Sequence, residues 1–300
     1  MTAASPALRK SLEALTAATD PAGRLAADPL GFVHRYTHAD DQEVAAVFAA
    51  GLAYGRVASF RPVIGAVLDQ ADRKGGPRRW LAALDAEDDR ILGALNHRWT
   101  RGPDLARLAR VLALVLARHG RVGDIAAAAD DPASPTLAPA LEAVVQTLRS
   151  AAEAESGRPF AELPRGFRYL LPAPSGGSAC KRWCMFLRWM VRRPGDGAAG
   201  VDLGLWDLDP ARLVMPLDTH VRRLAWFTGL TDRRDASWRT AVEVTRSLAR
   251  LDPEDPLRHD FALAHLGISG SCQGTFVKDI CGACSLAPIC RVPRAPRSPG

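Results

Sequence analysis

The chain has 300 residues, 47% of them hydrophobic and 24% charged, which excludes a disordered chain and predicts one large or two smaller folded domains. No apolar run is long enough to cross a bilayer, and the first twenty residues lack the apolar core of a signal peptide, so we expect a soluble, cytoplasmic protein with no membrane partner. The net charge of +6 suits an anionic partner without identifying one.

Helical patterns run through the chain. Residues 41–54 follow Asp40, an expected N-cap, and place apolar side chains three and four positions apart, as a one-sided helix does. The same period recurs over residues 104–118, 137–151 and 237–251. Alternating strand patterns bounded by turns are nearly absent, so we expect an all-α fold.

A basic and aromatic segment follows in the second half of the chain. It carries five cations and no acid, with three aromatic residues between them: Lys181, Arg182, Trp183, Phe186, Arg188, Trp189, Arg192 and Arg193. On its own this pattern favours a helix with a buried aromatic face and a solvated basic face. A Gly/Asp/Pro-rich crossing over residues 192–210 comes next, and the last residues, 292–300, predict a basic tail.

Four of the six cysteines lie close together near the end of the chain, at positions Cys272, Cys281, Cys284 and Cys290. The gaps between them are eight, two and five residues. Thiols stay reduced inside cells, so such a cluster predicts a metal site rather than disulfides. Zinc and an iron–sulfur cluster both accept four thiolates. The single two-residue gap, where zinc ribbons usually have two, favours an iron–sulfur cluster.

Two further segments support a resemblance. MPLDTHVRRLAWFTGL (215–230) and FALAHLGISGSC (261–272) place a DTHV.R motif before a helix that delivers the first cysteine. This arrangement resembles the endonuclease III and adenine glycosylase branch of the helix-hairpin-helix (HhH-GPD) DNA glycosylases. In that branch the cysteines hold a [4Fe–4S] cluster with gaps of six, two and five. The chain looks most similar to an uncharacterised bacterial branch of the superfamily.

The resemblance implies a two-lobed helical fold made of a six-helix barrel lobe and an iron–sulfur lobe. Residues 1–36 would form an N-terminal helix packed on the C-terminal lobe. Residues 37–214 would form the barrel, with the hairpin at about 163–193. Residues 215–300 would form the C-terminal lobe, with the [4Fe–4S] loop at 272–290 and zinc as the alternative metal.

The resemblance also implies catalytic residues. Asp218 would stabilise the positive charge that develops on the sugar when an N-glycosidic bond breaks, although an Asp at this position can also simply cap the helix that starts at Thr219. Members with lyase activity attack the sugar with a lysine of the hairpin's second helix. Lys181 is the candidate, but aligning the hairpin glycines places Ala179 or Cys180 there, so the register stays open. The alternative for Lys181 is a phosphate contact or a plain surface cation.

Contacts with DNA are implied at the hairpin and near the end of the first barrel helix. The hairpin would contribute Gly176, Gly177, Ser178 and Arg182, with Ser178 as a helix cap, and the region that fills the gap left by a flipped base would contribute Tyr54 and Arg56.

The sequence therefore predicts a monomeric base-excision-repair glycosylase. It would act on double-stranded DNA that contains a damaged or modified base, and abasic-site lyase activity is left open. The alternative is a non-catalytic protein that binds damaged or unusual DNA structures through the same fold and a four-cysteine metal site. The sequence does not predict which base is excised.

Overall fold

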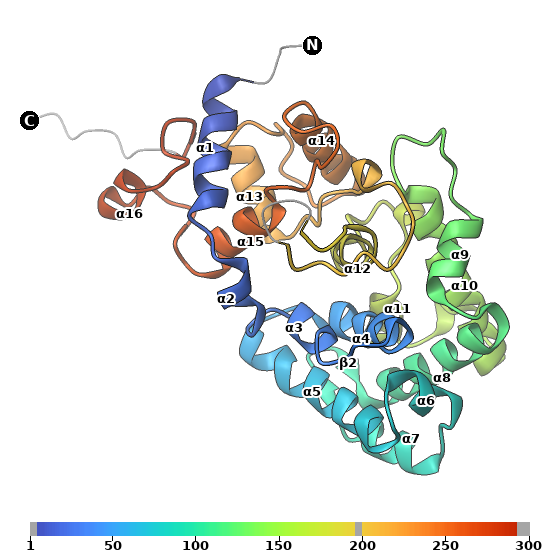
Figure 1. The fold of residues 1–300 in the computed structure, drawn as a ribbon. Coiled ribbons are helices and arrows are strands. Elements are labelled where there is room, and N and C mark those ends of the chain that lie inside the picture. The colour runs from blue at the N-terminus through green and yellow to red at the C-terminus, as the bar shows by residue number, and fades with distance from the viewer. Residues whose placement is uncertain (1–4, 196–199, 293–300) are drawn as a thin grey trace, which may run out of the picture.

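The structure is a computed structural model that describes residues 5–195 and 200–292 (Figure 1). The described part is mostly helical, as expected for the all-α class. Its strands are β1 (Asn96–His97) and β2 (Thr100–Arg101), which form one short antiparallel hairpin. None of its helices combines the length and the apolar character that a membrane span needs. The predicted basic tail lies outside the described residues from position 293 onward.

Sixteen α-helices follow one another in these ranges. They are α1 (Pro6–Ala17), α2 (Pro21–Leu25), α3 (Leu30–Val33), α4 (Ala39–Leu52), α5 (Val57–Arg73), α6 (Pro77–Ala82), α7 (Ala86–Gly93), α8 (Gly102–His119), α9 (Val122–Ala128), α10 (Ala138–Ser156), α11 (Arg165–Leu170), α12 (Lys181–Val191), α13 (Thr219–Phe227), α14 (Trp238–Ala249), α15 (Asp260–Ile268) and α16 (Lys278–Gly282). Short 3₁₀ turns lie at Phe160–Glu162, Pro174–Gly176 and Pro210–Arg212. The four helices predicted from periodicity correspond to α4, α8, α10 and α14.

Helix α4 differs from its prediction in two ways. Its N-cap is His38 rather than Asp40, which lies in the first helical turn. The helix is also buried almost all round, because α3, α5, α6 and α12 pack against it. Small residues such as Ala45, Ala46 and Ala49 let these neighbours approach from several sides. The prediction of a helix with a single buried face is therefore wrong for α4.

The N-terminal segment is shared between two parts of the molecule. In Figure 1, α1 lies beside α13 and α15, whereas α3 lies with α4. Arg9 of α1 donates to the Leu251 carbonyl (2.7 Å), and Thr16 Oγ1 lies 2.7 Å from His259 Nδ1. Helix α1 therefore contacts α15 and the residues before it, whereas α3 contacts α4.

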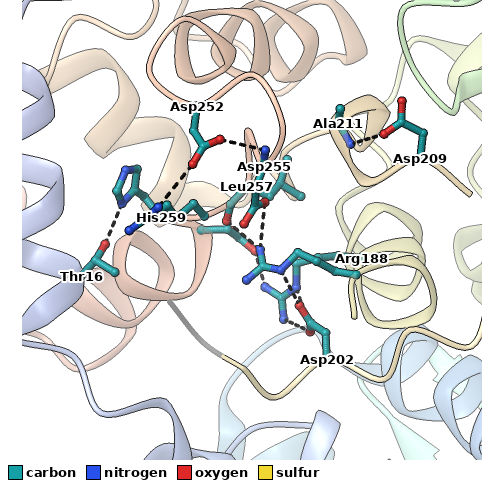
Figure 2. A network of polar contacts seen from close by, with 12 residues as sticks. Thr16, Arg188, Asp202, Asp209, Ala211, Asp252, Asp255, Leu257 and His259 are labelled. Carbon is teal, nitrogen blue, oxygen red and sulfur yellow. Dashed lines mark hydrogen bonds and ion pairs between the residues drawn. The ribbon is translucent and has the colours of Figure 1, made fainter. Parts of the chain in front are cut away.

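The predicted solvated basic face of α12 is wrong. Arg182, Arg188 and Arg192 are at most 6% exposed. Arg188 forms ion pairs with Asp202 and Asp260, and Arg192 lies 3.1 Å from the other oxygen of Asp202 (Figure 2). Buried guanidinium groups need such partners, and these partners come from the crossing over 192–210 and from α15. A pattern confined to one helix does not reveal them.

Candidate functional site

The four clustered cysteines line one pocket. Helix α15 ends at Ile268, Gly270 adopts a left-handed conformation (φ +76°), and the chain turns so that the Cys272 amide donates to the Leu266 carbonyl (3.1 Å). Cys281 lies in α16, and Cys284 and Cys290 follow in the turns after it. Each cysteine is partly exposed, and all four contribute to the walls of the pocket. The chain thus brings together the four thiols that the sequence predicted as ligands.

The remaining walls of this pocket are mainly apolar. They include Leu224 and Phe227 from α13, Leu266 from α15, and Leu286 after α16. Burial raises the pKa of the Cys290 thiol, and the neighbouring thiols of the other three cysteines add to this effect. An apolar pocket that gathers four thiols suits a positively charged metal centre better than free thiolates.

The spacing of the thiols bears on which metal fits. In residues 5–195 and 200–292 no three Cys, His, Asp or Glu side chains are placed to hold a single ion. Zinc with four ligands at about 2.3 Å draws its sulfurs to within about 3.8 Å of one another. A four-iron cluster is bound at separate corners, so its thiolates stand further apart around a cavity. In the described residues the four thiols share one pocket without forming a set close enough to hold a single ion.

Helix α13 begins at the predicted catalytic acid. Asp218 is its N-cap, and one carboxylate oxygen, Oδ1, accepts hydrogen bonds from the amides of His220 and Val221, both at 2.8 Å. Within the described part of the chain the second oxygen, Oδ2, has no hydrogen-bond partner, and the residue is partly exposed. Oδ1 therefore caps the helix, as the alternative prediction for Asp218 stated. The cap orients the carboxylate and does not use Oδ2.

The same helix reaches the cysteine pocket through Arg223, the last residue of the DTHV.R motif. Its Nη2 donates to the Cys272 carbonyl (3.0 Å), and its guanidinium covers Gly274, where an added Cβ would lie 2.6 Å from Nη1. Gly267 allows a similar close approach between α15 and α13, because a Cβ there would overlap the His220 side chain. These contacts hold α13, α15 and the cysteine loop together. The motif contains Arg223, but no role was predicted for it from the sequence.

The expected hairpin region forms two helices, α11 and α12, joined by an exposed turn. Gly177 is left-handed (φ +75°), and the space where side chains of Gly176 and Gly177 would lie is open. The prediction that Ser178 caps α12 is wrong. Its Oγ accepts from the amide of Cys180, and Cys180 itself is the N-cap in an unusual left-handed conformation (φ +47°).

The turn also touches two other elements. Gly177 accepts a hydrogen bond from the Trp238 amide at the start of α14 (2.9 Å). On the other side, Glu142 of α10 binds the Ser175 amide (3.0 Å) and hydroxyl (2.6 Å). Burial opposes it, but these hydrogen bonds hold the pKa of Glu142 below its usual value. The negative charge of Glu142 disfavours a phosphate on its side of the turn. A phosphate would therefore approach from the other side, around Gly176–Ser178.

Lys181 is the first residue of α12 and is partly exposed. Its Nζ lies 3.7 Å from Met185 Sδ, and among the described residues it has no carboxylate partner. Asp218 starts a different helix, and no hydrogen bond or ion pair joins the two residues across the described chain. In the described chain the amine of Lys181 thus contacts a thioether, has no acidic partner and is not linked to Asp218.

Arg182 and Tyr54 are brought into contact. The Arg182 guanidinium lies 5.1 Å from the Tyr54 ring centroid and donates to the carbonyls of Gly51 and Tyr169. Arg182 is only 6% exposed, and its donors bind backbone carbonyls. It therefore connects α4, α11 and α12, which corrects its prediction as a DNA contact. Arg56, in contrast, is exposed at the start of α5.

Two aromatic residues that the sequence did not single out complete the surface around Tyr54. Trp99, at the tip of the β1–β2 hairpin, stacks with Tyr54 (centroids 5.5 Å, interplanar angle 19°), and Tyr169 of α11 meets both rings edge-on. Trp99 is 42% and Tyr169 is 38% exposed. The strands of this hairpin are two residues long, too short to show an alternating pattern, so no sequence signal pointed to it.

Comparison with known proteins identifies a matching family model. A family model described as "Protein of unknown function (DUF2400)" matches residues 28–269, which include α3 to α15 but end before Cys272. No curated protein and no solved structure matches the chain.

Proposed function

Because the chain belongs to the DUF2400 family, whose description assigns no activity, we propose a function from the site: a DNA glycosylase that releases a damaged or modified base from duplex DNA. The observation that carries the proposal is the arrangement of α13. The helix begins at a carboxylate with one oxygen fixed and one free, and its other end packs on a pocket lined by four cysteines. The resemblance described above associates the same two features, an acid in a DTHV.R motif and a four-cysteine loop.

The chemistry assigned to Asp218 follows from its geometry. Breaking an N-glycosidic bond leaves positive charge on the sugar, which a nearby fixed carboxylate stabilises. The two amide donors orient the Asp218 carboxylate through Oδ1, so that Oδ2 can face the anomeric carbon or hold the attacking water. The proton of that water passes to the carboxylate as the new bond to the sugar forms.

In this proposal Cys272, Cys281, Cys284 and Cys290 hold a [4Fe–4S] cluster, with zinc as the alternative. The cluster supplies structural bracing of the loop and takes no part in base release. Arg223, which bonds the carbonyl of the first ligand, positions the loop against α13. The exposed Lys278 and Arg291 on this loop are then available to the DNA backbone.

The activity is tested with duplexes that each carry one damaged or modified base. Wild-type protein should leave abasic sites in at least one of them. Asp218→Asn keeps an oxygen acceptor for the cap, and it should lower base release by about 10²-fold to 10⁴-fold. Asp209→Asn is the matched control, because Asp209 caps a helical turn in the same way, with its Oδ1 2.9 Å from the Ala211 amide, and lies outside the proposed site (Figure 2).

Two outcomes would change the proposal. Base release that survives Asp218→Asn would remove Asp218 from the reaction. Tight binding to damaged duplexes with no base released from any of them would favour the non-catalytic DNA-damage binding protein.

Lyase activity is a second part of the proposal, and it depends on the amine of Lys181. A free amine attacks C1′ of the abasic sugar, loses water to form a Schiff base, and lets the 3′ phosphate leave by elimination. Borohydride should reduce that imine and link wild-type protein to abasic DNA. Lys181→Ala should lose the linkage, and Lys10→Ala, an exposed lysine on α1, should keep it. Trapping that persists in Lys181→Ala would assign the attack to another amine.

A further inference from the structure

A second surface of the molecule, which includes the predicted DNA contacts Tyr54 and Arg56, has features that the chemistry at Asp218 does not use. It is formed by Tyr54 after α4, Trp99 at the tip of the β1–β2 hairpin, and Tyr169 in α11. We call these three residues the aromatic surface. Exposed large apolar side chains are few in the described chain, and two of the five are Trp99 and Tyr169, in contact with each other. Large rings gathered in this way mark a binding surface more often than scattered single ones do.

The aromatic surface is rigid. The Tyr54 hydroxyl donates to the His97 carbonyl (2.8 Å) and lies 2.7 Å from Thr100 Oγ1, while His97 Nε2 lies 2.8 Å from the Tyr54 carbonyl. Beneath the rings, the buried Arg182 guanidinium lies 4.2 Å from the Tyr169 centroid. Rings fixed by buried polar groups lose little freedom when a ligand stacks on them, which favours binding.

Unpaired positive charge surrounds these rings. Exposed arginines lie on all the segments that form the surface, namely Arg56, Arg98, Arg101, Arg165 and Arg168. The segments 54–58, 96–101 and 165–170 contain no acidic residue. The nearest acids in sequence are Asp104, which is 3% exposed and accepts the backbone amide of Arg101, and Glu162, which is exposed and pairs with Arg158 (3.6 Å). Rings with free cations around them match a ligand that is flat and aromatic but carries negative charge, which describes a nucleotide strand.

Arg98 provides a second, independent observation. It adopts a left-handed backbone conformation (φ +56°), which is strained for an arginine, and its guanidinium lies 4.5 Å over the Trp99 ring. Gly55 allows this placement, since a Cβ there would lie 3.0 Å from Arg98 Cδ. In the described chain Arg98 has no carboxylate partner, so a base can take its place on Trp99 while the guanidinium moves to the adjoining phosphate.

We propose that the aromatic surface stacks an unpaired nucleobase, with Arg98 and the neighbouring arginines binding the phosphates on either side of it. This inference rests on the proposed function only for the choice of DNA as the polymer. It adds a binding site for single-stranded nucleotides on the elements β1–β2, α11 and the end of α4, which do not carry Asp218.

Binding to a single-stranded oligonucleotide and to a fully paired duplex tests the inference. Base stacking on one aromatic ring suggests that Trp99→Ala weakens binding to the single strand by about 10-fold to 100-fold. Trp99→Phe keeps a ring and should stay within about threefold of wild type. The matched control is Leu114→Ala, which removes an exposed apolar side chain (49%) from α8 and should change nothing. Binding to the paired duplex should change far less in all three variants.

Photo-cross-linking gives a readout that does not depend on variants. A single strand that carries 5-iodouracil should link to a peptide containing residues 98–101 or Tyr169. No binding to the single strand, equal loss in Trp99→Ala and Leu114→Ala, or linkage confined to other peptides would overturn the inference. None of these results touches base release by wild-type protein, so the proposed glycosylase activity stands or falls on its own assay.

Discussion

Helices α12 and α13 both begin at a residue that the resemblance assigns to chemistry, yet their charged side chains lie in opposite surroundings. Along α12, Arg182, Arg188 and Arg192 are buried and bound to groups of the protein itself. At α13, Asp218 and Arg223 are partly exposed, and the helix leads to a pocket of four thiols. The fold neutralises the buried charge along α12, whereas Oδ2 of Asp218 at the start of α13 has no hydrogen-bond partner in the described chain. Charge content alone therefore does not separate a structural helix from a functional one.

The largest effect is expected at the cysteine pocket. Structural metal centres contribute on the order of 10 kcal/mol to the folding of the units that they hold. Cys284→Ala removes a pocket thiol, so purified protein should lose the visible colour and nearly all of its iron, about four atoms per chain in wild type. Cys184→Ala is the control, because this buried α12 cysteine lies outside the pocket and its pKa is raised by burial. Equal iron in both variants, or zinc in place of iron, would show that the pocket does not hold an iron–sulfur cluster.

The second effect concerns α12. Asp202 is 2% exposed and faces Arg188 (Figure 2), and its other carboxylate oxygen lies 3.1 Å from Arg192. Asp202→Ala leaves buried guanidinium charge without this partner, so the free energy of unfolding should fall by about 3–5 kcal/mol in denaturant titrations. Asp207→Ala, in the same crossing, removes an acid that is fully exposed and 3.9 Å from Arg193, and it should cause no measurable change. A small effect at Asp202 would mean that Asp260 and Asp255 neutralise both arginines without it.

A third effect appears with pH, at the contact between α1 and the residues before α15. Burial lowers the pKa of His259 to about 4, from an ordinary value of 6.5. Between these values the unfolded chain binds the proton and the folded one does not, so stability is complete above pH 6.5 and falls as the pH drops toward 4. The loss attributable to His259 reaches about 3 kcal/mol near pH 4.

His259→Gln should flatten the fall in unfolding free energy between pH 6.5 and 4 relative to wild type. His119→Gln, at an exposed histidine in the last turn of α8, should leave the pH dependence unchanged. Burial also raises the pKa of acids such as Asp260, which acts on stability with the opposite sign as the pH falls, so only the difference between variants isolates His259. The same slope in all three proteins would show that His259 gains its proton without cost in the fold.

These regions also differ in how much the sequence could predict. The periodic helices and the cysteine cluster follow from local spacing, because helical period and ligand reach act over a few residues. The partners of Arg188 do not follow, since Asp202 and Asp260 lie 14 and 72 residues away along the chain. The contact between Trp99 and Tyr169 joins two segments that only the tertiary fold brings together.

The smallest effect is expected where α13 meets the cysteine loop, at Arg223. A hydrogen bond from a charged donor to a carbonyl contributes about 1.5–3 kcal/mol, and Arg223 makes one to Cys272 while also covering Gly274. Arg223→Ala should therefore speed the loss of iron to a chelator and raise hydrogen exchange over residues 272–284, with α12 unaffected. Arg222→Ala is the matched control, because the neighbouring arginine bonds the Arg234 carbonyl instead of the loop. If both variants release iron at the wild-type rate, the loop is held by its own turns and by the apolar pocket. Helix α13 would then contact both Asp218 and the cysteine pocket without coupling them.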